Sequence, residues 1–528
     1  MSADLSANLT LKLDVEIKVD LNAGRLPGDR GFIFSTGYEL KSAIKYLRFL
    51  RDSETQAFDY GPMSSWDVSR VTDFSDLFRG MTSFNPQPGT SDDISQWDTG
   101  AATTFDRMFE RCCLFNLHLP WNTLKVDTMH SVFRGCTLFN NGGQPFTWHT
   151  GSVLSMNSMF RDCKSWNQDL PLVLNTCRVL WMDNMFQNCE SWNQLVDFSV
   201  YPTGSRCLSM SDMFRGCTRL DQRVVLRAES VCYMQDMFRD CSRLTHMPSL
   251  STTAELDNTS RMFMNCYKFN PLEPVVFTTS RVHFMTKMFL GCREFDQTVH
   301  LDTGSVNCME GMFSGCQRFN NGGVSLVINM GMVECSSFMF EGCALFNQRL
   351  VSDEHGGMVD TRSVRMFAFM FYGCRSLNQP LFMTIHSTAT VSSMFRLCYA
   401  QAEVLPVCTL TQHRSACMID TLRAQHINGK SDKSTVAEFE NIFLRRNVGG
   451  PGFGGPIDRQ FWVLQRAQIT KEFARSERIG GTALAAGAML TDYDPDCSWA
   501  ESEEQVRRAQ KRAQKRRVAS VNVFITNN

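Results

Sequence analysis

Residues 312–320, Met-Phe-Ser-Gly-Cys-Gln-Arg-Phe-Asn, decide the fold, because close copies of this stretch recur through most of the 528-residue chain. The thirteen copies are spaced by 24 to 31 residues, with a mean of about 26. Self-similarity at a period of this size is typical of a repeat protein. The second residue of the motif, called here the repeat Phe, occupies these positions: Phe78, Phe109, Phe133, Phe160, Phe186, Phe214, Phe238, Phe263, Phe289, Phe313, Phe340, Phe371 and Phe395.

Each repeat predicts one short helical turn and one short strand. Apolar residues precede the repeat Phe in steps of three, three and one, as in Val153, Met156, Met159 and Phe160, and this spacing favours a helical or 3₁₀ turn. A brief alternating stretch such as residues 298–301 follows, which is typical of a strand. One unit cannot bury its apolar side alone, so we expect neighbouring units to stack. The predicted fold class is a leucine-rich-repeat-like solenoid with small mixed flanking regions.

Several columns of the repeat have structural interpretations. Met before the repeat Phe is expected to fill gaps beside the rings, with a Met-rich binding surface as the alternative. The Asn column that includes Asn116 and Asn140 is expected to bond from coil to coil rather than to bind a ligand. In seven copies a Gly two residues after the repeat Phe suits a turn end with positive φ. These are Gly80, Gly135, Gly216, Gly291, Gly315, Gly342 and Gly373.

Twelve of the 21 cysteines form a further column, three residues after the repeat Phe, which we call the Cys column. Metal binding is disfavoured, because no Cys-x-x-Cys occurs and equivalent ligands would form a line. Disulfides are conceivable, since in-register coils lie about 4.8 Å apart. The preferred interpretation is a column of buried free thiols, which the odd total and the charged first twenty residues favour. The column consists of Cys112, Cys136, Cys163, Cys189, Cys217, Cys241, Cys266, Cys292, Cys316, Cys343, Cys374 and Cys398.

The repeat resembles the BspA-like surface-protein repeats and, more closely, the mycoplasma-lipoprotein-type repeat. The resemblance rests on Trp66-Asp67-Val68-Ser69-Arg70-Val71 leading to Leu77-Phe78, and it covers about residues 61–405. It implies a leucine-rich-repeat-like solenoid that binds proteins, in bacterial surface proteins, protists, algae and large DNA viruses, and it implies no enzyme activity or cofactor. The domains expected are therefore an N-terminal arm or cap (1–60), a thirteen-repeat solenoid (61–405) and a C-terminal region (406–528).

The flanks carry the candidate partner-binding residues. Residues 9–21 alternate strictly between apolar and polar, which predicts a long amphipathic strand acting as an assembly arm. A Gly-rich linker at 449–456, a basic helix and a terminal strand are predicted in the C-terminal region, whereas residues 424–431 only formally resemble a phosphate-binding loop. The candidates are Leu9, Leu11, Leu13, Val15, Ile17, Val19 and Leu21 in the arm and Arg507, Arg508, Lys511 and Arg512 in the basic helix.

Composition bounds the function. A formal net charge of −1 gives no overall attraction to nucleic acid or anionic lipid, so nucleic acid is expected, if at all, only at the basic C-terminal helix. The chain contains no run of about 18 apolar residues, so no transmembrane helix is predicted. No signal peptide is evident, which favours an intracellular or virion location. The leading hypothesis is a non-enzymatic interaction scaffold in a larger assembly such as a virion. The alternatives are an extracellular adhesin and, least favoured, an enzyme with its site in residues 406–528.

Overall fold

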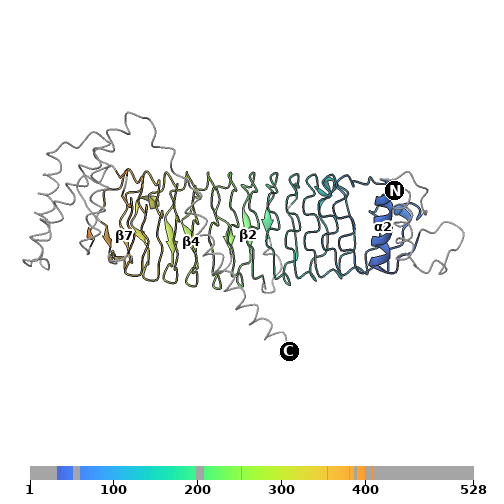
Figure 1. Ribbon diagram of the computed structural model, residues 1–528, viewed down its shortest axis with the longest axis horizontal. Coiled ribbons are helices and arrows are strands. Elements are labelled where there is room, and N and C mark those ends of the chain that lie inside the picture. Colours follow the sequence, from blue (N-terminus) through green and yellow to red (C-terminus); the bar gives the residue numbers. More distant parts are fainter. Residues whose placement is uncertain are drawn as a thin grey trace, which may run out of the picture. The chain divides into compact units, whose positions relative to one another are not determined.

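The computed structural model describes residues 32–51, 60–398 and 407–408, apart from residues 171, 198–206, 251–252, 354, 380, 384, 386–388 and 396. The chain divides into two compact units, Met1–Glu440 and Asn441–Asn528, and every described residue belongs to the first. Within that unit the repeats form coils that lie side by side in sequence order, with the helix α2 (Gly37–Arg51) at the N-terminal end of the stack (Figure 1). The predicted arm at 9–21, the segments 424–431 and 449–456, and the terminal helix and strand lie outside the described residues.

The segment around each repeat Phe is a run of tight turns, called here the turn run, and the predicted helical turn is wrong. In the coil of Phe109, every second N–H from Phe105 to Arg111 donates to a backbone carbonyl of the next coil, at 2.6 to 3.3 Å. The N–H groups of Met108, Glu110 and Cys112 donate to the carbonyl three residues earlier, at 2.9 to 3.1 Å. Half of the donors therefore hold the coil together and the other half join it to its neighbour.

Two positions in each turn run have positive φ, as type II β-turns require at their third residue. They lie two residues before and two residues after the repeat Phe, as in Arg107 (φ 56°) and Arg111 (φ 65°). The expectation of positive φ at the Gly of the motif is confirmed at all seven glycines, with φ between 69° and 77°. Asn and Asp, which tolerate this region better than other side chains, take the same place in coils such as those of Asn188 and Asp240.

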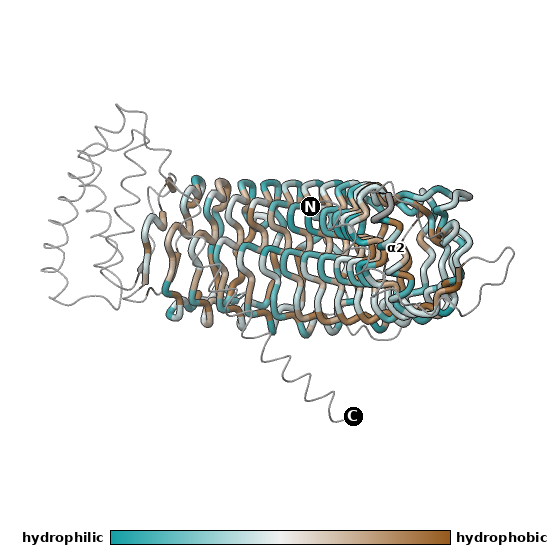
Figure 2. Tube along the Cα trace, turned by 45° about the vertical axis from the view of Figure 1, so that its right-hand side comes forward, coloured by the Kyte–Doolittle hydropathy of each residue, from teal (hydrophilic) through white to brown (hydrophobic). Residues whose placement is uncertain are grey.

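Consecutive turns explain why the sequence imitates a helix. In consecutive four-residue turns, two neighbouring side chains point inward and the next two point outward. Phe105, Met108, Phe109 and Cys112 therefore point inward and are fully buried. Their spacing of three, one and three is also the spacing along one face of a helix. The same apolar positions recur in neighbouring coils and form bands along the stack (Figure 2).

Short parallel strands join many of the coils. From β1 (Val196–Asp197) onward, a short strand follows the motif, as predicted. Strands β2 (Val224–Leu226) and β5 (Val299–Leu301) coincide with stretches expected from the sequence. The sheets have the orders β1–β2–β3, β4–β5, β6–β7 and β8–β9, all parallel. The strands are β1 (Val196–Asp197), β2 (Val224–Leu226), β3 (Ser249–Leu250), β4 (Val275–Phe277), β5 (Val299–Leu301), β6 (Leu326–Val327), β7 (Leu350–Val351), β8 (Phe382–Met383) and β9 (Val407–Cys408).

A second parallel ladder, which the sequence did not indicate, runs through every coil. The residue five positions before each repeat Phe pairs with its equivalent in the next coil, from Asp73 to Thr390. This ladder continues directly into the turn run. Three short 3₁₀ helices occupy corners of the coils: η1 (Met63–Ser65), η2 (Asn141–Gly143) and η3 (Asn321–Gly323).

Helix α2 caps the first coil. The Thr36 hydroxyl accepts a bond from the Glu39 N–H at 3.2 Å, while the Glu39 carboxylate accepts from the Ser35 and Thr36 N–H groups at 2.8 and 3.1 Å. This reciprocal capping box satisfies donors that a helix start leaves unpaired. The α2 side chains of Leu40, Ala43 and Ile44 are buried. A terminal cap of this kind protects the apolar end of a repeat stack. The predicted arm or cap region thus includes a helix that the sequence interpretation missed.

The core is a continuous stack of aromatic rings. Successive repeat Phe rings have centroids 5.4 to 5.7 Å apart and planes within 10° of parallel, through all thirteen coils. A second column stacks beside it, as in Phe295 and Phe319 at 5.5 Å. Near the N-terminal end, Trp66, Trp97 and Trp121 stack 6.2 Å apart as a third column. Coils without these rings place Leu in the second column, such as the buried Leu220 and Leu244.

Replacement of Phe263 by Ala in the middle of this stack should lower the unfolding free energy by about 3 to 5 kcal/mol, because the ring leaves a cavity between two neighbours. Arg293 is exposed and lies over the Tyr267 ring at 4.8 Å, so Arg293→Ala should cost no more than about 1 kcal/mol. Urea denaturation of the two variants measures both effects. Equal losses would contradict the assignment of the repeat Phe to the core.

Candidate functional site

The outer side of the turn runs forms one continuous surface, called here the turn face. It consists of the outward-pointing side chains among the residues from five before to two after each repeat Phe. Because the inward positions are occupied by the same few residue types in every coil, variation between coils is concentrated on the outward positions. The turn face is therefore where individual coils differ in chemistry.

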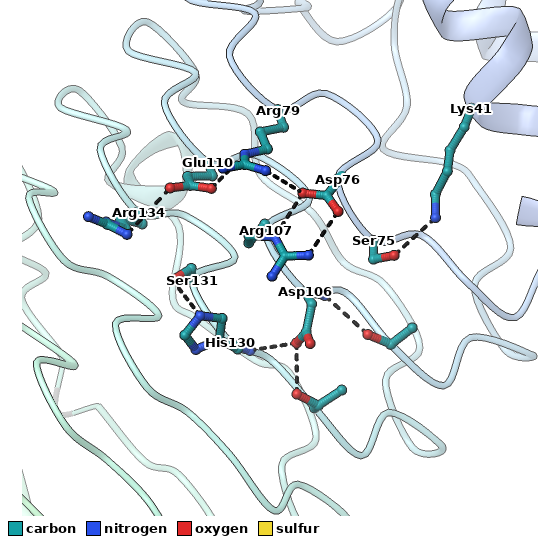
Figure 3. Close-up of polar contacts among 12 residues, drawn as sticks. Lys41, Ser75, Asp76, Arg79, Asp106, Arg107, Glu110, His130, Ser131 and Arg134 are labelled. Atoms are coloured by element: carbon teal, nitrogen blue, oxygen red, sulfur yellow. Dashed lines mark hydrogen bonds and ion pairs between the residues drawn. The ribbon is translucent and has the colours of Figure 1, made fainter. Parts of the chain in front are cut away.

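Near the N-terminal end the turn face is a network of ion pairs (Figure 3). The Arg107 guanidinium donates to both carboxylate oxygens of Asp76, at 2.8 and 2.9 Å. Buried Glu110 lies between Arg79 (2.8 Å) and Arg134 (3.5 Å), which come from the coils on either side. The bond from Arg107 lowers the pKa of Asp76 below its ordinary value. These pairs lie between coils and join them along the stack.

The helix α2 is tied to the same network. Lys41 donates to Asp73 at 2.8 Å and to Ser75 at 2.9 Å, both on the first turn run (Figure 3 shows Lys41 and Ser75). Partly exposed pairs of this kind contribute little energy individually, and their network fixes how the cap sits on the first coil.

In the middle of the stack the turn face holds three carboxylates that are partly or fully buried. The Arg261 guanidinium donates three hydrogen bonds to the Asp236 carboxylate, the shortest at 2.7 Å. Asp212 lies beside them, and burial together with the charge of Asp236 raises the pKa of Asp212. Asp183 accepts bonds from the Ser209 hydroxyl and from the Ser211 N–H, yet burial still raises the pKa of Asp183.

Over the same coils the ladder beside the turn run exposes large apolar side chains. Leu154 and Trp181 are 37 % and 41 % exposed, although such residues are ordinarily inside. Backbone bonds join the leucines of this region: the Leu180 N–H donates to the Leu154 carbonyl and the Leu208 N–H to the Leu180 carbonyl, each at 2.8 Å. Trp181 follows Leu180 directly in the chain and pairs in the ladder with Ser155 and Ser209. We call Leu154, Leu180, Trp181, Leu208 and Tyr233 the Leu–Trp patch. At the equivalent position of the flanking coils stand Asp127 and Asp257.

Further along the turn face, two cysteines outside the Cys column meet. Cys308 and Cys335 are paired in the parallel ladder, and one carboxylate oxygen of Glu310 and both sulfurs lie within 4.8 Å of one another. A hydrogen bond between the two sulfurs lowers the pKa of Cys308 to about 7, aided by the Thr286 hydroxyl, and raises that of Cys335. Of these residues only Cys308 is partly exposed.

The Cys column is built from buried free thiols, as the preferred interpretation held. Each Sγ donates to the carbonyl of the repeat Phe in the preceding coil, as Cys136 does to Phe109 at 3.0 Å. That carbonyl also accepts the N–H of its own Cys112 at 2.9 Å, so the thiol supplies a second bond to a buried acceptor. Burial raises the pKa of Cys112 to about 12 and that of Cys136 well above its ordinary value.

The Asn column has the structural role that was predicted. The Asn116 side-chain oxygen accepts the backbone N–H of Asn140 at 2.7 Å, and Asn140 in turn accepts that of Asn167 at 3.1 Å. The same bond recurs from coil to coil up to Thr245 and again from Asn270 to Asn378. The Met residues before the repeat Phe are buried, so they belong to the core and not to a binding surface.

The predicted partner-binding residues in the arm and in the basic helix lie outside the described residues, so their roles stay predictions. The sequence interpretation missed both the Leu–Trp patch and the Cys308–Glu310–Cys335 group. For the second group a signal existed: Cys308 and Cys335 share a position in successive repeats but do not belong to the Cys column. Within the part of the chain that the structure describes, no helix is long and apolar enough to cross a bilayer.

The described fold defines a repeat protein, with short strands in small parallel sheets and few helices. The chain belongs to the family described as "Mycoplasma protein of unknown function, DUF285", which confirms the resemblance seen in the repeats. The matched segments are residues 52–141, 119–223, 202–298, 272–356 and 299–405. No match to the chain was found among the curated proteins or among the solved structures.

Thiol reactivity should separate the two kinds of cysteine. In the native protein at neutral pH, in the presence of a chelator, we expect iodoacetamide to modify Cys308 early, because its pKa of about 7 gives it a large thiolate fraction. The Cys column should react only in denaturant. Peptide mapping by mass spectrometry measures both. Native labelling of column cysteines, or disulfides recovered between them, would refute the packing role.

The carboxyl of Asp183 should make stability depend on pH. Because its pKa is raised in the folded state, ionisation disfavours folding, so stability falls as pH rises from the ordinary Asp value, about 3.9, through the raised folded value. Asp183→Asn cannot ionise and should gain melting temperature relative to the wild type across that interval. The exposed Asp169, replaced by Asn, is the control. A difference for Asp183→Asn that does not change with pH would show that ionisation is irrelevant.

Proposed function

We propose that the chain is a non-enzymatic scaffold that binds another protein along its repeats, as a component of a larger assembly such as a virion. The repeats would form a leucine-rich-repeat-like solenoid, in which each coil contacts only its neighbours and one long surface faces outward. The parallel ladders and the stacked rings support this architecture. The intracellular or virion location remains part of the same proposal.

The Leu–Trp patch is the observation that carries the proposal. It places two exposed and three partly exposed large side chains along one ladder over four successive coils. Contiguous exposed apolar surface marks interaction sites, and Trp is enriched among the residues that dominate binding energy. The exposed Asp127 beside the patch favours a partner whose apolar segment carries a basic residue at one end.

Proteins bound to the full-length chain in its native source can be identified by cross-linking and mass spectrometry. The strongest of these is then tested as a purified pair. The double variant Leu154→Glu with Trp181→Glu should weaken binding at least about a hundredfold, since two hot-spot contacts are lost. Leu272→Glu is the matched control, because Leu272 is 93 % exposed and lies outside the patch.

Unchanged affinity of the double variant, with a melting temperature like that of the wild type, would remove the patch from the interface. Binding lost equally in the Leu272→Glu control would show that added negative charge, and not the patch, is responsible. Loss only in the double variant supports the proposal.

A further inference from the structure

The paired cysteines on the turn face have a carboxylate as their neighbour. Cys308 and Cys335 are direct partners in the parallel ladder, so their side chains leave adjacent coils in the same direction. Glu310 follows Cys308 by two residues and reaches the same point. One ligand atom from each of the three residues lies within 4.8 Å of the other two.

We propose that Cys308, Glu310 and Cys335 bind a divalent cation of the zinc class. Thiolate sulfur and carboxylate oxygen are both ligands of Zn²⁺, at about 2.3 Å and about 2.0 to 2.2 Å. Ligand atoms at those distances in a tetrahedron lie about 3.5 to 3.8 Å apart, so small side-chain rotations close the set. Two sulfur ligands favour zinc over magnesium or calcium. Three protein ligands leave the fourth position to water.

The surroundings complete the site. The Lys287 ammonium lies 3.4 Å from one Glu310 oxygen and is buried, which leaves the second oxygen for the ion. The Thr286 hydroxyl donates to the Cys308 sulfur at 3.3 Å and so orients that ligand. Two thiolates and a carboxylate carry three negative charges, which the divalent ion and Lys287 balance together.

A disulfide between Cys308 and Cys335 is the competing chemistry, because paired residues of neighbouring strands are close enough to be bridged. A disulfide, however, gives the nearly buried Glu310 no partner beyond Lys287. A carboxylate in such surroundings is costly unless it is paired or coordinates a metal. The three-residue group as a whole therefore fits a cation better than it fits a bridge.

The test uses the full-length chain, purified with a phosphine reductant, stripped with a chelator and dialysed against ZnCl₂. Elemental mass spectrometry should find one tightly held zinc per chain, and Co²⁺ in its place should give the near-ultraviolet charge-transfer absorption of sulfur ligands. Cys308→Ser and Cys335→Ser should each abolish the tight zinc. Glu310→Gln should weaken it on the order of tenfold or more.

Cys177→Ser is the matched control, since Cys177 is partly exposed and lies away from the group. The melting temperature of each metal-free variant shows whether it is folded, and zinc should raise it in the wild type and in Cys177→Ser but not in Cys308→Ser or Cys335→Ser. Equal zinc content in all variants, no zinc in the folded wild type, or a Cys308–Cys335 disulfide that persists with zinc under reductant would each overturn the proposal.

Discussion

The structure depends on the alternate use of backbone N–H groups in the turn run. In an α-helix every N–H in the interior bonds within the segment, and in a strand the bonds go to neighbouring strands. Here half of the donors close turns and half bond to the next coil. The first set shapes each coil, and the second set holds the coil at the distance of a parallel strand. Each coil thus provides the acceptors that the preceding coil needs.

The side-chain columns follow from this spacing. Rings held about 5.5 Å apart, in planes nearly parallel, fill the space between coils along the whole stack. Thiols reach the repeat Phe carbonyl of the coil before, and Asn oxygens reach the backbone N–H of the coil after. The Cys thiols and the Asn oxygens therefore supply hydrogen bonds to backbone carbonyl and N–H groups outside the two ladders. Positive φ at residues such as Arg107 and Phe338 costs energy, which these bonds to both neighbours offset.

The frame fixes the inward positions and the two positions of positive φ in each turn run, so the remaining outward positions are free to carry function. Ion pairs occupy the outward positions near α2. The Leu–Trp patch lies along the middle coils, and the Cys308–Glu310–Cys335 group lies further along the stack. None of these is needed for stacking, since other coils stack without them. Exposed Leu154 and Trp181 with three partly exposed neighbours, and a buried carboxylate beside two thiols, are arrangements that folding alone does not explain.

Much of this protein was readable from its sequence. The thirteen motifs, the positive φ of the motif glycines, the ring stack, the buried thiols and the Asn ladder are consequences of a local pattern repeated at one period. The helical turn was misread, because positions such as Phe105, Met108, Phe109 and Cys112 have the same spacing in a helix and in consecutive β-turns. Only the destination of each N–H distinguishes the two.

Tertiary structure decided the sites. Cys308 and Cys335 are 27 residues apart, and Leu154 and Leu180, which a backbone bond joins, are 26 apart. They meet because coils of unequal length nevertheless align in one ladder register. The motif aligns equivalent positions of successive coils, but it does not show that the position five residues before each repeat Phe is a hydrogen-bonded ladder beside an outward surface. The sequence by itself therefore determined what every coil shares, and only the folded stack decided which outward side chains became neighbours.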